Sequence, residues 1–190
     1  MRKYNMIIIG ISTGGPNALR KLVPALSCKI KLPIFIIQHM PKGFTKILAD
    51  GLNELSELEI KEGENEVIKA GTVYVLPGGQ DSKLVKVGNV LKLYPENKRI
   101  GFYNPSVDYF LESVNKISSI NPLIAILTGM GRDGTEGILN LKENKRSFVL
   151  TQEEKSCVVY GMPKSIDKLG LSDVSGLTEK EIGNEINKRA

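Results

Sequence analysis

The fold is decided by residues 5–16, which read NMIIIGISTGGP. Asn5–Ile11 is a short, β-branched apolar run, typical of a strand that is buried on both faces. The glycines that follow permit a sharp turn, and Pro16 suits the first position of a helix over Pro16–Leu26. A strand that passes through such a turn into a helix is the opening unit of an α/β sheet.

Strands and helices alternate along the rest of the chain. We predict strands at residues 33–38, 57–61, 72–76, 122–127 and 147–151, and helices at 44–52, 105–117, 134–143, 163–169 and 178–188. Residues 83–94 differ, because two apolar runs flank Gly88-Asn89 and predict a β-hairpin. The expected fold class is α/β, a three-layer, doubly wound, mainly parallel sheet with helices on both faces and a small hairpin near residues 83–94.

Length and composition exclude several classes of protein. We expect the 190 residues to form a single domain. Two cysteines, Cys28 and Cys157, are too few for a disulfide scaffold or a cysteine-rich zinc site, and a single histidine excludes a His-only metal centre. No apolar run approaches the about 18 residues of a membrane helix, so we expect a cytoplasmic chain that is not inserted in a membrane.

Charge is unevenly distributed. The formal net charge is +5, and residues 1–50 hold eight Lys or Arg against one acid, Asp50. Such a face suits an acidic partner, although solvated helix and loop surfaces explain most charge runs. The chain lacks a run of five basic residues and a basic strand studded with aromatics, so we expect no nucleic-acid partner.

The first candidate for chemistry is Ser12, directly after the first strand. Gly10-x-Ser12-x-Gly14 fits the nucleophile-elbow pattern in its strand-to-helix context, and the next helix presents free N–H groups to a developing oxyanion. The same loop could bind phosphate, or Ser12 could cap the helix. The residues alone leave these interpretations open.

Two further candidates follow later strands. His39 comes directly after the strand at 33–38, and an ordinary imidazole titrates near pH 6.5, so it can take a proton from a hydroxyl. Asp133 follows the strand at 122–127 and could orient that imidazole. It could instead cap the next helix or pair with Arg132. Together the three strand ends predict a hydrogen-bonded Ser-His-Asp chain.

Longer motifs around these residues resemble the catalytic domain of chemotaxis protein-glutamate methylesterases, the CheB family. They are IGISTGGP at 9–16, QHMP at 38–41, PGG at 77–79, PSVD at 105–108, LTGMGRDG at 127–134 and VYGMP at 159–163. They occur in the expected order over nearly the whole chain. The residues between them depart at Gln80-Asp81, where the family often has a histidine.

The resemblance implies a function and assigns roles. It implies hydrolysis of glutamate methyl esters on chemoreceptors, with release of methanol and deamidation of receptor glutamines in many members. By motif match, Ser12 is the nucleophile, His39 the general base and Asp133 the orienting carboxylate. The oxyanion and substrate-binding positions map to the backbone N–H of Met130 and to Thr13 and Gly131.

The resemblance also implies what the enzyme binds. It implies no metal and no other cofactor, and its expected partners are the cytoplasmic helices of methyl-accepting chemoreceptors. The receiver domain that usually precedes this domain is not expected in residues 1–190, because the first strand starts within about six residues of Met1. The alternative functions are a non-catalytic adaptor that binds receptors and a phosphate- or nucleotide-binding module at Gly14-Gly15.

Overall fold

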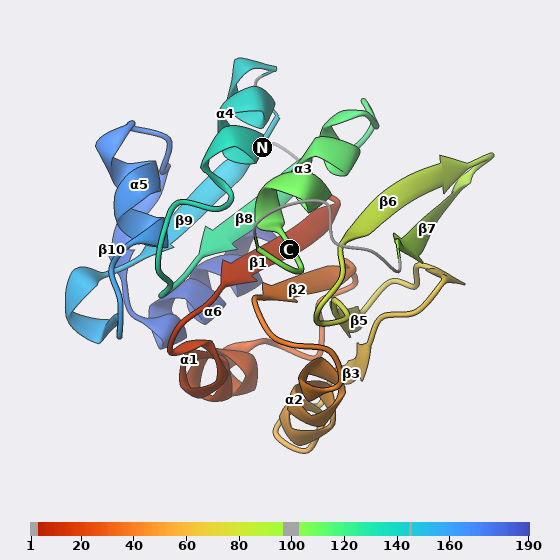
Figure 1. Cartoon of the computed structure of the whole chain (residues 1–190), viewed down its shortest axis with the longest axis horizontal. Coiled ribbons are helices and arrows are strands. Elements are labelled where there is room, and N and C mark those ends of the chain that lie inside the picture. Colours follow the sequence, from red (N-terminus) through yellow and green to blue (C-terminus); the bar gives the residue numbers. More distant parts are fainter. Residues whose placement is uncertain (1–3, 97–102, 145) are drawn as a thin grey trace.

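Strands and helices alternate in the computed structural model, which describes residues 4–96, 103–144 and 146–190 (Figure 1). The strands are β1 (Met6–Ile11), β2 (Ile34–Gln38), β3 (Glu59–Glu62), β4 (Glu66–Val67), β5 (Thr72–Val75), β6 (Ser82–Val87), β7 (Val90–Pro95), β8 (Pro122–Ile126), β9 (Phe148–Gln152) and β10 (Val174–Leu177). The α-helices are α1 (Gly15–Leu22), α2 (Phe44–Asn53), α3 (Val107–Asn115), α4 (Thr135–Glu143), α5 (Met162–Lys168) and α6 (Glu179–Arg189).

The main sheet has seven strands in the order β10-β9-β8-β1-β2-β5-β3, and its neighbouring strands pair in parallel. The chain proceeds from β1 through β2 on one side, and β8 adds to the other side of β1. The strand order therefore reverses at β1, and ligands bind beyond the carboxyl ends of strands at such a point. The predicted α/β class is confirmed.

Side chains that alternate along β1 enter two separate cores. Ile7 and Ile9 pack in the core beneath α1, α2 and α6, whereas Met6 and Ile8 pack in the core beneath α3, α4 and α5. Every residue of β1 is buried, which explains why its sequence is a continuous apolar run. The three layers, helices on both faces of the sheet, are visible in Figure 1.

A small antiparallel sheet of order β4-β7-β6 stands beside the main sheet (Figure 1). Its β6–β7 hairpin turns at Gly88, whose φ of 59° favours glycine, as the predicted turn requires. The sheet rests on α3, where Ser113 Oγ accepts a hydrogen bond from the Leu84 N–H at 2.9 Å. The hairpin predicted at 83–94 is confirmed.

Several element boundaries differ from the prediction. The helix expected to reach Leu26 ends as an α-helix at Leu22 and continues as one 3₁₀ turn, because Pro24 has no N–H to donate. The helix expected from Pro105 begins at Val107, and Ser106 is its N-cap. The strands β4 and β10 were not predicted, because each is short and only partly buried. None of the helices in the described ranges combines the length and apolarity needed to cross a membrane.

Candidate active site

Three neighbouring strands bring the predicted residues together. Ser12, His39 and Asp133 follow β1, β2 and β8, and β1 is paired with both of the others. The loops are tied to one another by backbone hydrogen bonds, because Ser12 N–H donates to Thr128 O at 2.9 Å and His39 N–H donates to Ile11 O at 3.2 Å. The candidate site therefore lies at the carboxyl edge of the sheet, where the strand order reverses.

Ser12 lies at the beginning of a tight turn. Its carbonyl accepts a hydrogen bond from Gly15 N–H at 2.8 Å, and Gly14, with a φ of 83°, is the N-cap of α1. The side chain of Ser12 is therefore not the cap of α1, which was one alternative interpretation. Its Oγ makes no hydrogen bond to any other described residue and remains available for chemistry.

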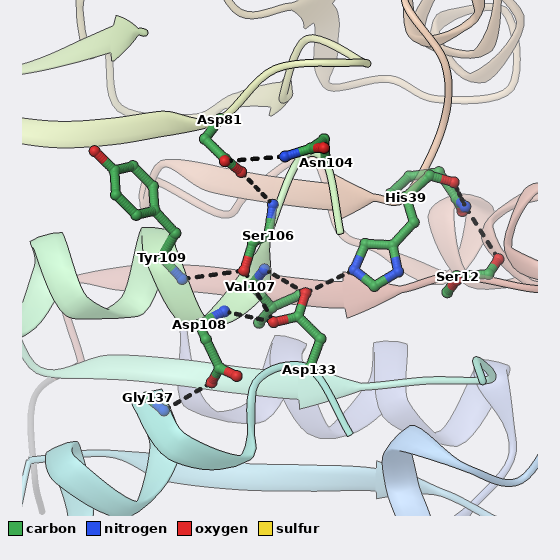
Figure 2. Close-up of polar contacts among 11 residues, drawn as sticks. Ser12, His39, Asp81, Asn104, Ser106, Val107, Asp108, Tyr109, Asp133 and Gly137 are labelled. Carbon is green, nitrogen blue, oxygen red and sulfur yellow. Dashed lines mark hydrogen bonds and ion pairs between the residues drawn. The ribbon is translucent and has the colours of Figure 1, made fainter. Parts of the chain in front are cut away.

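His39 is held on two sides. Its Nε2 lies 2.7 Å from Asp133 Oδ2, and its ring stacks on Tyr103 with the centroids 4.7 Å apart and the planes 9° from parallel. Its Nδ1 is buried and has no hydrogen-bond partner among the described residues. Figure 2 shows Nδ1 on the side of the ring that faces Ser12. The expected hydrogen bond from Ser12 to His39 is not formed, so one link of the predicted chain is present and the other is open.

Asp133 is the most strongly hydrogen-bonded group of the site, and its residue is 3% exposed. Besides the contact with His39, its carboxylate accepts from Val107 N–H at 2.7 Å, Asp108 N–H at 2.9 Å and Ser106 Oγ at 3.0 Å (Figure 2). Burial alone would raise the pKa of Asp133, but the hydrogen bonds from His39 and from the two backbone N–H groups hold that pKa below its ordinary value.

Asp133 therefore caps a helix, but not the one that follows it. Its N–H donors belong to the first turn of α3, whose positive dipole end favours a carboxylate. The N-cap of α4 is Gly134, which has no side chain to contribute. Arg132 is exposed and is not among the ion-pair partners found for Asp133 in the described residues. Both alternative interpretations of Asp133, as the cap of the following helix and as the ion-pair partner of Arg132, are therefore wrong.

The contacts define which nitrogen of His39 can act as a base. An ionised carboxylate only accepts hydrogen bonds, so the Nε2 that contacts Asp133 carries the proton in the neutral ring. The lone pair is then on Nδ1, the buried nitrogen without a partner. In the serine-protease arrangement the two ring nitrogens have the opposite assignment. Proton transfer from a hydroxyl at Ser12 to Nδ1 is the chemistry that this arrangement allows.

The predicted oxyanion positions lie on the two loops that flank Ser12. Within the described part of the chain, neither the Thr13 N–H nor the Met130 N–H donates to another group, so both remain free to bind an oxyanion. Gly129 N–H and Thr128 Oγ1 instead bond to the backbone of Val159 and Thr13 and fix these loops. Gly131 has a φ of 85° and lies directly against the ring of Tyr103.

The residues that the sequence did not indicate are those that orient the others. Gln38 is buried, and its Nε2 donates to the carbonyls of both Ser12 and His39 at 3.0 Å. Its position next to His39 at a strand end was the available signal. Tyr103, which stacks on His39, has no such signal, because nothing in the local pattern around Asn104-Pro105 indicates where the ring lies.

Asp108 makes the reciprocal contact between the same two helices. Its Oδ1, in the first turn of α3, accepts from Gly137 N–H in the first turn of α4 at 2.8 Å, while Asp133 just before α4 accepts from α3. Burial raises the pKa of Asp108 to about 6; the Gly137 N–H opposes that shift, and the negative charge of Asp133 adds to it. The ionised form of Asp108 is therefore unfavourable in the folded chain.

Replacing Asp108 by Asn is expected to stabilise the protein above pH 6. The amide oxygen still accepts from Gly137 N–H, while the unfavourable charge is removed. Because the folded pKa lies above the ordinary 3.8, the folded chain holds a proton that the unfolded chain has lost, and wild-type stability falls as pH rises through about 4 to 6. We expect Asp108→Asn to raise Tm by a few degrees at pH 7–8 and to lose this gain below about pH 4. Thermal unfolding against pH measures it.

The matched control is Asp50→Asn, since Asp50 is an exposed carboxylate that pairs with Lys46 one helical turn away. We expect its Tm to stay near that of the wild type across the range. An Asp108→Asn variant that is less stable than the wild type at pH 8 would contradict the assignment of an unfavourable charge.

Known proteins resemble this chain over most of its length. The sequence model of the CheB methylesterase family matches residues 7–186. A relative from Bacillus licheniformis, named protein-glutamate methylesterase/protein-glutamine glutaminase, is 42% identical over 88% of this chain and 48% of its own length. A relative of the same name from Archaeoglobus fulgidus is 43% identical over 86% of this chain and 47% of its own length. The chain thus spans about half the length of these curated relatives.

A solved structure extends the comparison to the fold. The crystal structure of the Thermotoga maritima CheB methylesterase catalytic domain covers 100% of this chain and 100% of that domain, with a TM-score of 0.92 and 35% sequence identity. The family model and the solved structure both cover the residues that carry the strand-end motifs. The chain belongs to the CheB methylesterase family.

Proposed function

We propose that this chain is a protein-glutamate methylesterase that hydrolyses the methyl esters of glutamate side chains on chemoreceptors. The observation that carries the proposal is the state of His39. One nitrogen is held by a buried carboxylate at 2.7 Å, and the other is unpartnered on the side of Ser12. That is the arrangement of a general base that waits for a hydroxyl. The names of the curated relatives give the same activity.

In the proposed mechanism, the Oγ of Ser12 attacks the ester carbonyl and transfers its proton to Nδ1 of His39. The tetrahedral oxyanion is bound by the free N–H groups of Met130 and Thr13. The intermediate collapses, the ester C–O bond breaks, and methanol leaves with the proton from His39. Water, deprotonated by the same Nδ1, then cleaves the acyl-enzyme and regenerates Ser12. Asp133 stabilises the imidazolium that forms in each half-reaction.

The same site supports deamidation. A glutamine side chain presents the same carbonyl with an amine in place of the methoxy group, and the proton from His39 would leave with ammonia. The curated relatives carry the name protein-glutamine glutaminase as well. We therefore include receptor glutamines among the proposed substrates.

The proposal extends to the setting of the enzyme. We propose that residues 1–190 form one methylesterase catalytic domain, that it acts in the cytoplasm, and that its partners are the cytoplasmic helices of methyl-accepting chemoreceptors. The family match over residues 7–186 supports the domain assignment. The excess of Lys and Arg in residues 1–50 supports an acidic helical substrate.

The test is release of methanol from a receptor cytoplasmic fragment whose glutamates carry radiolabelled methyl esters. We expect the chain to release methanol from this fragment and to release far less from free glutamate γ-methyl ester at the same ester concentration. Binding of the fragment without methanol above the buffer rate would indicate an adaptor and contradict the proposal. Ammonia release from unmethylated fragments that contain glutamine tests the deamidase activity separately.

Substitution of Gly129 tests whether the position of Ser12 matters for this reaction. A Cβ added to Gly129 would lie 2.8 Å from the Cβ of Ser12 and 2.3 Å from the Sδ of Met162. The flexible Met162 side chain can move away, but the Cβ of Ser12 cannot move without its backbone turn, so the added methyl group must push the two loops apart and shift the nucleophile. We expect Gly129→Ala to lower the rate of methanol release by about 10- to 100-fold. Gly43→Ala, where a Cβ meets nothing within 4 Å, is the control for adding a methyl group; its φ of 89° makes a small loss of stability expected there. Equal rates for Gly129→Ala and the wild type would contradict the prediction.

A further inference from the structure

Asp81 is a buried carboxylate that the proposed reaction does not use. It is 0% exposed, and it lies directly before β6 rather than after one of the three strands that carry the candidate triad. Its Oδ1 accepts from Ser106 N–H at 2.8 Å, and its Oδ2 accepts from Asn104 Nδ2 at 3.0 Å (Figure 2). Burying a carboxylate costs free energy unless such bonds compensate, so its presence calls for a role.

The backbone that Asp81 holds is the segment that surrounds the His39–Asp133 pair. Ser106 donates its hydroxyl to Asp133 Oδ1, and the next two backbone N–H groups also donate to that carboxylate. Three of the four donors found for Asp133 thus come from residues 106–108. The position of these donors depends on the Ser106 backbone, which Asp81 holds.

The same segment also contacts the imidazole. Tyr103 stacks on the His39 ring, and the carbonyl of Asn104 accepts from the N–H of Met40, the residue after His39. Asp81 accepts from the side chain of Asn104 and from the N–H of Ser106. Among the described residues, these bonds therefore lie between Tyr103, which stacks on His39, and Ser106, which bonds Asp133. Figure 2 shows this sequence of contacts from Asp81 through Ser106 to Asp133 and His39.

We propose that Asp81 is a positioning residue for the His39–Asp133 pair, acting through residues 103–108. It touches neither reacting group. Loss of its carboxylate leaves the Ser106 N–H and the Asn104 amide without this partner, and the segment can shift away from Asp133 and from the ring of His39. The expected change in kcat rests on the proposed function. The expected change in the position of the His39–Asp133 pair does not depend on which ester is cleaved.

Two substitutions at Asp81 separate positioning from charge. Asp81→Ala removes both acceptors. Asp81→Asn can rebuild both bonds, because its amide oxygen can accept from Ser106 N–H and its amide nitrogen can donate to Asn104 once the Asn104 amide has rotated by half a turn. The proposal therefore expects the conservative variant to rescue what the alanine variant loses.

The control is an exposed carboxylate that also accepts a backbone N–H, at the opposite end of the strands from the site. Asp173 accepts from Val149 N–H at 2.7 Å and pairs with Lys142, at the opposite edge of the sheet near the start of β9. Asp173→Ala is expected to lower the thermal stability without changing the geometry of the candidate triad.

The experiment has a kinetic and a spectroscopic readout. The first is kcat and KM for methanol release from methylated receptor fragments. The second is the NMR signal of the Nε2–H proton of His39, which needs no assignment by mutation because the chain contains one histidine. A ring N–H that donates to a carboxylate resonates at unusually low field, and this signal broadens or shifts when the contact loosens.

We expect Asp81→Ala to lower kcat by about 10- to 100-fold with KM nearly unchanged, and to broaden or shift the low-field signal. Asp81→Asn and Asp173→Ala are expected to keep both kcat and the signal. Wild-type kcat together with an unchanged signal in Asp81→Ala would overturn the proposal, and so would a loss of kcat and signal in Asp173→Ala that matches the loss in Asp81→Ala.

Should Asp81→Ala not fold, Asn104→Ala removes the bond from the Asn104 amide and leaves the carboxylate in place. A lower kcat and a shifted signal in this variant would support the proposal, and wild-type values of both would overturn it. If the wild type released no methanol, the proposed function would fail while the NMR comparison still tested the positioning role of Asp81.

Discussion

Replacing His39 by Gln is expected to lower kcat for methanol release by about 10⁴- to 10⁶-fold, the loss found when a triad histidine is removed from other serine hydrolases. Glutamine can still donate a hydrogen bond to Asp133, but it has no basic nitrogen to accept the proton of Ser12. The chain has no second imidazole, because His39 is its only histidine. Steady-state methanol release over pH 5–9 measures the effect.

Rescue by free imidazole provides the control. A companion variant, His39→Ala, leaves a space against the ring of Tyr103, and free imidazole added to the buffer should restore part of its activity. A His39→Gln enzyme within tenfold of the wild-type rate would show that another group is the base.

The sheet could be predicted from the sequence because every strand in its centre is an unbroken apolar run. β1, β2 and β8 are buried on both faces, so their sequences are apolar runs, with the one polar residue, Gln38, at the end of β2, and they stand out between helices with one apolar face. The edge strand β10 reads Val-Ser-Gly-Leu, and two of its residues are exposed. Pairing with β9 rather than its own pattern makes it a strand, so the sequence alone does not reveal it.

The candidate triad could be predicted for a similar reason. In a parallel sheet the carboxyl ends of neighbouring strands lie together, so Ser12, His39 and Asp133 were expected to converge. The surroundings of Asp133 could not be predicted, because Ser106, Val107 and Asp108 reach it from a different helix. Ser106 is the N-cap of α3, and its hydroxyl also donates to Asp133.

The contacts of Tyr103 and Asp81 depend on tertiary structure in the same way. Residues 81 and 103 are separated in the sequence by the β6–β7 hairpin. Asp81 reaches Ser106, and Tyr103 reaches His39, only in the folded chain. No local pattern records that path. At Asp81 the motif comparison marked a departure from the family pattern without assigning the side chain a role, and in the folded chain that side chain is buried and bonds the backbone of Ser106.

Replacing Ser12 by Ala is expected to have an effect as large as the loss of His39. The variant retains the free N–H groups of Thr13 and Met130 and the His39–Asp133 pair, so the substrate and the oxyanion site remain. It has no hydroxyl to form the acyl-enzyme, and reaction can proceed only by direct attack of water. In other serine hydrolases this loss costs about 10⁶-fold in kcat. Ser165→Ala, a serine on α5 whose hydroxyl bonds Thr135 and Met162, is the matched control and is expected to keep its activity.

The measurement that tests the account most directly is therefore methanol release from one preparation of methylated receptor fragments by the wild type, Ser12→Ala and Ser165→Ala, with folding of each verified by thermal unfolding. We predict rapid release by the wild type and Ser165→Ala, and release at the buffer rate by Ser12→Ala. Equal release by the wild type and a folded Ser12→Ala would contradict the central claim that Ser12 is the nucleophile.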